Sequence, residues 1–69
     1  MSSKGVVSWF NDQKGFGFIT NEEGQDVYVH YSEVNRDGFK TLEVGEKVIF
    51  EMVDEGSAPK AVSVRIVTY

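Results

Sequence analysis

The stretch KGFGFIT, from Lys14 to Thr20, places two phenylalanines at alternate positions with a glycine between them. A second stretch, VYVHY from Val27 to Tyr31, has the same two-residue period. Alternation of this kind is typical of a β-strand that buries only one of its faces. Both stretches therefore predict strands, and both place aromatic rings repeatedly on one face.

Working outward, three more segments are rich in β-branched and aromatic residues and are bounded by turn residues. The expected strands span residues 5–11, 15–20, 26–31, 47–53 and 60–67. Between them we expect a hairpin loop at 21–25, a long loop at 35–46 and a turn at 54–59 that contains the only proline. We therefore predict an all-β fold, a five-stranded antiparallel barrel, because closing a small sheet removes its exposed edges.

The 69 residues form a single domain, 1–69, without an internal repeat or linker. The chain has no cysteine, so neither disulfides nor a thiolate metal site support the fold. No apolar run approaches the ~18 residues of a membrane span, and the first residues lack the apolar segment of a secretory signal. We expect a soluble cytoplasmic protein that needs no cofactor or metal and does not bind membranes.

The formal net charge of −4 would, taken alone, argue against a nucleic-acid partner. The acidic residues are unevenly distributed, however. Five of them crowd the second half of the chain: Glu43, Glu46, Glu51, Asp54 and Glu55. The stretch from Lys14 to Asn21 carries one cation and no acid, so the position of the charges matters more than their sum.

Alternation and pairing of the second and third strands bring Phe16, Phe18, Tyr28 and His30 onto one face. The alternative is that the phenylalanines lie inside, since phenylalanine is usually a core residue. We favour the outside, because other apolar residues can fill a narrow barrel. The expected core residues are Ile19, Val27, Val29, Val48, Phe50, Val62 and Val64. By the same alternation, Tyr31 shares the inner face of Val27 and Val29.

An exposed aromatic patch on a small protein usually marks a binding surface, and nucleobases are common flat ligands. The candidate stacking residues are Trp9, Phe16, Phe18, Tyr28, His30, Tyr31 and Phe39. The candidate phosphate contacts are Lys14, Lys40 and Lys60, and the candidates for reading base edges are Asp26, Tyr28, Tyr31 and Ser32. Gly15 and Gly17 either leave bare backbone for a flat ligand or, at Gly17, mark a bulge or bend.

At this point SWFNDQKGFGFIT (8–20) and DVYVHYS (26–32) resemble the cold-shock domain. Its two ribonucleoprotein-type motifs correspond to KGFGFI (14–19) and VYVHY (27–31), and GFKTLEVGE (38–46) and PKAVSV (59–64) follow in the expected order. The resemblance covers about residues 4–66. It implies an oligonucleotide-binding barrel that binds single-stranded RNA and DNA, with pyrimidine-rich strands expected. It also implies a monomeric RNA chaperone that regulates transcription and translation in cold shock, a stress response.

The family's stacking positions fall on the seven aromatic candidates above, and its cation position falls on Lys14. Phe10 also matches a family aromatic, but alternation sets it opposite Trp9, so we expect it to be partly in the core. Ser8 and Ser57 stand where the family often has a basic residue. We expect these departures to affect affinity more than function, because stacking carries the larger share of binding.

Two other functions compete with nucleic-acid binding. An enzyme is disfavoured, because His30 is the only histidine and no nucleophile-elbow or metal-ligand spacing is present. A protein or carbohydrate binder on the same barrel is the second alternative, since aromatic platforms also stack on sugars. Lys14 and the two motifs favour nucleic acid.

Overall fold

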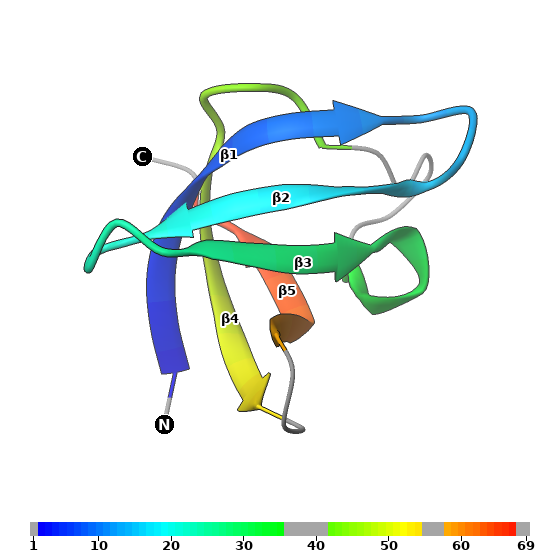
Figure 1. The fold of residues 1–69 in the computed structure, drawn as a ribbon. Coiled ribbons are helices and arrows are strands. Elements are labelled where there is room, and N and C mark those ends of the chain that lie inside the picture. The colour runs from blue at the N-terminus through cyan, green and yellow to red at the C-terminus, as the bar shows by residue number, and fades with distance from the viewer. Residues whose placement is uncertain (1, 36–41, 55–57, 68–69) are drawn as a thin grey trace.

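The computed structural model describes residues 2–35, 42–54 and 58–67. These residues form five strands and one 3-10 helix (Figure 1): β1 (Ser2–Asn11), β2 (Phe16–Asn21), β3 (Asp26–His30), η1 (Tyr31–Glu33), β4 (Lys47–Asp54) and β5 (Pro59–Ile66). All five predicted strands are present, although the first begins at Ser2 and the third ends at His30. No helix in the described residues is long and apolar enough to cross a bilayer.

The strands close into a barrel in the order β1-β2-β3-β5-β4. β1 pairs antiparallel with β2 and β4, and the pairs β2–β3 and β4–β5 are also antiparallel. The predicted all-β five-stranded barrel is confirmed, with one correction: β3 and β5 run parallel. An odd number of strands cannot alternate in direction around a closed ring, so one parallel pair is required.

The barrel interior is filled by apolar side chains, each at most 4% exposed. The buried apolar residues are Val7, Ile19, Val27, Val29, Val34, Leu42, Val48, Phe50, Ala61 and Val64. The prediction that Val62 belongs to this core is wrong, because it is only half-buried. The β4–β5 register shifts between Ile49 and Glu51, and Ser63 on β5 adopts a φ of 53°. This bulge breaks the alternation, so that Ala61 and Val64 point inward instead.

A second bulge lies in β1. Val7 pairs with Ile19, but the next pair is Trp9 with Phe18, which leaves Ser8 as an extra residue. Trp9 is therefore on the outside and 43% exposed, while Val7 is buried. Phe10 turns back toward the interior and packs against the core, as predicted.

The glycines of the KGFGF stretch do not leave open backbone for a ligand, so that prediction is wrong. Both Gly15 and Gly17 are buried. A Cβ atom on Gly17 would collide with the Trp9 carbonyl oxygen and would lie 2.7 Å from the Phe10 Cα. At Gly15, where φ is 79°, a Cβ atom would lie 2.5 Å from Cδ1 of Tyr31. Glycine is thus required for close packing of the chain against itself.

The loop between β2 and β3 is organised by one buried polar side chain, Asn21, which is 8% exposed. Its Oδ1 accepts hydrogen bonds from the backbone N–H groups of Glu23 and Gln25, at 3.0 and 2.9 Å. Its Nδ2 donates to the side-chain oxygen of Gln25 at 3.1 Å. The predicted hairpin loop at 21–25 is confirmed, and it sets the register in which β2 meets β3.

Candidate nucleic-acid interface

Five aromatic side chains share the outward side of β1, β2 and β3, which run side by side in Figure 1. We call this the aromatic face, and its members are Trp9, Phe16, Phe18, Tyr28 and His30. Strand pairing sets Phe18 between Trp9 and Tyr28, and sets Phe16 opposite His30. The intervening residues Ile19, Val27 and Val29 are fully buried. The alternative that placed the phenylalanines in the core is therefore excluded.

The rings of the aromatic face contact one another but keep part of their surface open. The Trp9 ring centroid lies 5.6 Å from that of Phe16, in an edge-on arrangement, and 6.2 Å from that of Phe18. Tyr28 stacks on Phe16 at 5.9 Å and meets Phe18 edge-on at 6.2 Å. Because each ring is braced by its neighbours, a ligand that stacks on them orders few side chains, which favours affinity.

At the end of the aromatic face where β2 begins, Tyr31 and Lys14 are both exposed. Tyr31 is 48% exposed and not on the inner face as alternation predicted, because β3 ends at His30 and Tyr31 begins η1. Its ring centroid lies 4.6 Å from that of His30, and its backbone N–H donates to the Gly15 carbonyl at 2.7 Å. Tyr31 thus continues the row of rings beyond the strands.

The turn that carries Lys14 is held by the last residue of β1. The Asn11 Oδ1 accepts hydrogen bonds from the backbone N–H groups of Gln13 and Lys14, both at 3.0 Å. The Asn11 carbonyl also accepts from the Gly15 N–H at 2.7 Å. The backbone of Lys14 is therefore fixed, and the residue is exposed at this end of the aromatic face.

Ser32 is positioned by His30. The His30 Nδ1 lies 2.9 Å from the Ser32 Oγ and accepts a hydrogen bond from the Ser32 N–H at 3.2 Å. His30 is the N-cap residue of η1. Its side chain accepts a hydrogen bond from a backbone N–H at the start of that helix, as short polar caps do. The contact thus has a structural role for His30 and Ser32 at the start of η1.

Asp26 lies at the other end of the aromatic face. It is exposed and pairs in register with Thr20, whose Oγ1 donates to the Asp26 Oδ1 at 3.2 Å. Alternation along β3 sets Asp26 on the same side as Tyr28. Asp26 therefore lies at the edge of the aromatic face, two residues before Tyr28 on β3.

A cleft of about 260 Å³ lies where β3 and η1 meet β5. It is lined by Tyr28, His30, Ser32, Glu33, Lys60, Ala61 and Val62. The parallel pairing sets Lys60 beside Tyr28, so four predicted site residues come together here. Sequence reasoning missed Glu33, Ala61 and Val62, since no local pattern reveals the register between β3 and β5. The predicted residues Phe39 and Lys40 lie outside the described part of the chain.

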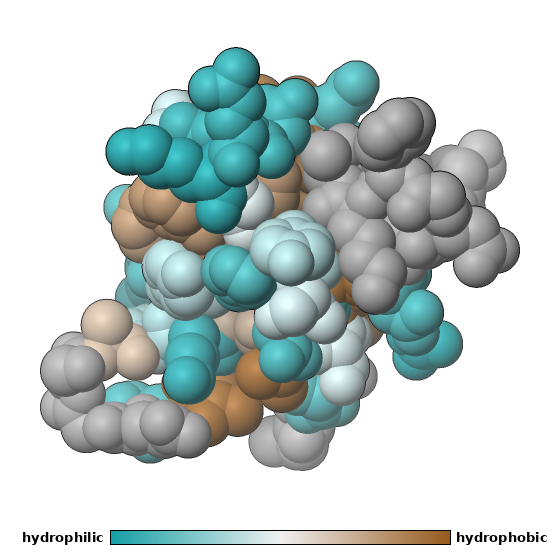
Figure 2. Space-filling model, turned by 90° about the vertical axis from the view of Figure 1, so that its right-hand side faces the viewer, coloured by the Kyte–Doolittle hydropathy of each residue, from teal (hydrophilic) through white to brown (hydrophobic). Residues whose placement is uncertain are grey.

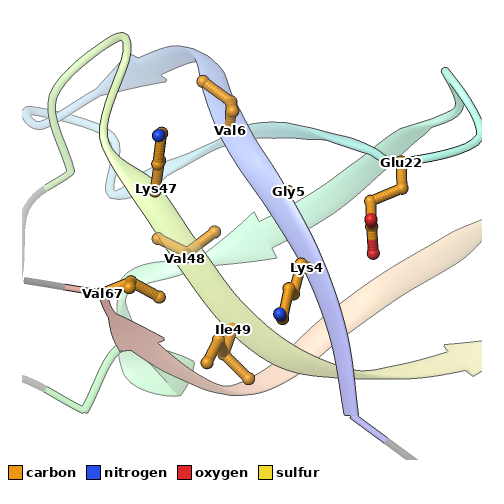
Figure 3. A pocket seen from close by; sticks show the side chains of 8 residues that line it. All are labelled: Lys4, Gly5, Val6, Glu22, Lys47, Val48, Ile49 and Val67. Carbon is orange, nitrogen blue, oxygen red and sulfur yellow. The ribbon is translucent and has the colours of Figure 1, made fainter.

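A larger hollow, of about 420 Å³, lies between β1 and β4 (Figure 3). It is lined by Lys4, Gly5, Val6, Glu22, Lys47, Val48, Ile49 and Val67, as the close-up shows. None of these is an aromatic residue, and none was predicted to bind a ligand. Because stacking requires rings, we assign the candidate site to the aromatic face and not to the larger hollow.

The surface at the end of the barrel that carries the β1–β2 turn and η1 is mixed in character. Figure 2 shows hydrophilic, intermediate and apolar residues interspersed on this side rather than gathered into one apolar patch. A surface of this kind suits a ligand that has both flat apolar faces and charged or polar edges.

Comparison with known proteins supports the fold independently. A solved chain described as "drosophila Unr CSD456" superimposes with a TM-score of 0.83 at 22% sequence identity, over 99% of this chain and 27% of that one. The chain thus spans about a quarter of the length of that solved chain. At this level of identity the likeness shows that the two share the barrel fold.

Curated relatives match at higher identity. The "Cold shock-like protein CspD" of Bacillus cereus is 57% identical over 87% of this chain and 91% of its own length. The "Major cold shock protein" of Streptococcus pyogenes serotype M1 is 50% identical over 90% and 92%, respectively. The family described as "'Cold-shock' DNA-binding domain" matches residues 3–67. The resemblance noted in the sequence is confirmed: this chain belongs to the cold-shock domain family.

Proposed function

We propose that this protein binds single-stranded RNA and DNA by stacking unpaired bases on the aromatic face. The observation that carries the proposal is the row Trp9–Phe18–Tyr28, which crosses three strands with adjacent ring centroids 6.2 Å apart. Each ring offers a π-face to a base, and one stack contributes about 1–3 kcal/mol. Three or four stacks together outweigh the unfavourable net charge of the chain.

Two lysines beside the rings would contact the phosphates of the bound nucleic acid. Lys14 lies in the turn before β2, and Lys60 lies on β5 in register with Tyr28. Because these positions flank the aromatic face, the charges act locally even though the chain as a whole is acidic. Asp26 and Ser32, at the two ends of the face, would read base edges through hydrogen bonds.

Stacking of bases does not require a 2′-hydroxyl group, so RNA and DNA can both bind. A protein that binds only unpaired bases shifts the equilibrium of a folded RNA toward its open form. This is the physical basis of an RNA chaperone and, through RNA structure, of control over transcription and translation. We propose that the protein acts in this way in the cytoplasm during cold shock, as a monomer, and prefers pyrimidine-rich strands.

The test uses Trp9, the only tryptophan of the chain, as a fluorescent reporter. A thymine hexamer and a soluble glucan are titrated into the protein separately. Quenching by the hexamer alone is the expected result, because a base that stacks on the indole changes its environment. Quenching by the glucan alone would assign the face to carbohydrate, and no response to the hexamer would contradict the proposal.

A further inference from the structure

The cleft beside the aromatic face contains two groups of opposite charge. Glu33 of η1 and Lys60 of β5 both line it. Tyr28 and His30, two members of the aromatic face, line the same cleft. A single-stranded nucleic acid that lies across the aromatic face therefore passes a place where a hydrogen-bond acceptor, a hydrogen-bond donor and a ring lie close together.

Glu33 is tied to β5 by the bulge in that strand. The backbone N–H of Ser63 donates to the Glu33 Oε1 at 3.4 Å. Ser63 has a φ of 53°, a left-handed conformation that costs a residue with a Cβ atom roughly 1–2 kcal/mol. Backbone strain of this kind persists where the surrounding structure demands it and is frequent at ligand sites. Here it places a donor at the carboxylate of Glu33, a residue that lines the cleft.

A carboxylate beside a nucleic-acid strand would repel the phosphates, so its favourable partners are the N–H groups of bases. An ionised carboxylate has about four acceptor sites, and Ser63 uses one of them on Glu33. In a single strand the Watson–Crick edge of each base is free to be read. Guanine is the base whose edge offers two adjacent N–H donors, at N1 and N2, next to the acceptor O6.

We propose that this cleft is a guanine-binding subsite. The Glu33 carboxylate accepts hydrogen bonds from N1–H and N2–H, the Lys60 ammonium donates to O6, and the base packs against the Tyr28 ring. Cytosine and adenine offer a single amino group on this edge, and thymine or uracil a single ring N–H, so each pairs with only one carboxylate oxygen. The inference rests on the proposed function and adds one purine position to an otherwise pyrimidine-rich strand.

The experiment compares thymine hexamers in which a single guanine, adenine or cytosine occupies each position in turn, with Trp9 fluorescence as the readout. At one position guanine is expected to tighten binding about tenfold relative to the all-thymine hexamer, as two good base-edge contacts do. Hypoxanthine at that position lacks the 2-amino group, and the gain is expected to fall to about threefold. 7-Deazaguanine keeps the whole Watson–Crick edge and is expected to retain the tenfold gain.

The variant Glu33→Gln removes the charge and one good acceptor while preserving the size of the side chain. Its guanine-to-thymine affinity ratio is expected to fall below about threefold. Glu23→Gln, in the exposed turn between β2 and β3, removes the same charge and is expected to keep the parent ratio. The guanine-to-hypoxanthine ratio of the parent protein needs no variant, so it tests the proposal even if Glu33→Gln does not fold.

The proposal is overturned if guanine gains nothing at any position, if adenine or cytosine gains as much, or if Glu33→Gln keeps the full guanine ratio. These results would leave stacking on the aromatic face intact, because the all-thymine hexamer would still bind. If the parent protein binds none of the hexamers, the proposed function fails together with the subsite. The two failures are therefore distinguishable.

Discussion

Trp9 lies directly opposite Phe18 on the outside of the barrel, although Val7, two residues earlier on the same strand, lies opposite Ile19 inside it. The bulge at Ser8 separates the two pairs. The Ser8 Oγ donates a hydrogen bond to the Phe18 carbonyl at 3.1 Å. Without the extra residue, alternation would send Trp9 inward with Val7, and the row of rings would lose its first member.

Ser8→Lys is expected to tighten binding of a pyrimidine hexamer. Ser8 is exposed and directly precedes Trp9, so a lysine there can reach the phosphate beside a base stacked on the indole. One added phosphate contact on a single strand steepens the slope of log affinity against log salt concentration by about 0.7. This corresponds to roughly fivefold tighter binding at ~0.1 M salt. Titrations of both proteins across a salt series, followed by Trp9 fluorescence, measure the two slopes. Parallel slopes would show that position 8 does not face the phosphates.

Phe18→Ala is expected to weaken binding of the hexamer by about 1–3 kcal/mol, the contribution of one stacked base. The cost in folding stability is expected to be small, because Phe18 is 36% exposed. Met52→Ala is a matched control, since Met52 has a similar exposure of 38% but lies on β4, away from the aromatic face. Equal losses of affinity in the two variants would contradict the role of Phe18 as a stacking residue.

Phe50→Ala is expected to show the opposite pattern. Phe50 is 1% exposed in the centre of the barrel, and truncation of a buried phenylalanine costs about 3–5 kcal/mol of unfolding free energy. Urea denaturation measures the loss. The fraction that stays folded is expected to bind the hexamer with the affinity of the parent, because the rings of the aromatic face remain. A stability loss below that of Phe18→Ala would reverse the assignment of faces.

Gly17→Ala is expected to destabilise the protein more than Gly24→Ala does. The new Cβ atom at position 17 would meet backbone atoms of Trp9 and Phe10, which cannot rotate away. At Gly24, where φ is 83°, the conformation is strained for alanine but the space is open. Overpacking costs about 1–3 kcal/mol and left-handed strain roughly 1–2 kcal/mol. Thermal melts rank the two variants, and the reverse order would show that the contact at Gly17 relaxes easily.

Duplex DNA is expected to bind poorly compared with single strands of the same sequence. Stacking on Phe16, Phe18 and Tyr28 requires free base faces, which a duplex hides within its own stack. A gel-shift competition at fixed salt compares the two forms, and mixed-sequence single strands serve as the reference. Equal competition by duplex and single strand would contradict stacking as the mechanism.

Much of the fold could be predicted because its signals are local. A period of two along β2 and β3 set Phe18 and Tyr28 on one face and Ile19 and Val29 on the other, and the structure has them there. The hairpin loop at 21–25 followed from polar residues and one glycine. The predicted roles of the aromatic residues and lysines in binding remain predictions, to be tested by the variants above.

Other features depend on which strands meet and in what register. Val62 was expected in the core, but the bulge at Ser63 moves the inward positions of β5 to Ala61 and Val64. The outward position of Trp9 likewise requires the bulge at Ser8. The proximity of Glu33 to Lys60 exists only because β3 and β5 run parallel where the barrel closes.

The physical reason for this division is the range of the interactions. Alternation of side chains is a property of each extended backbone by itself, so the residues of a single strand reveal its two faces. A bulge or a register is the result of pairing and packing between segments far apart in the chain, and a slip of one residue reverses every face. The strands and the face on which most of their rings lie could therefore be predicted from the sequence. The cleft and the continuous aromatic face arise only when the barrel closes.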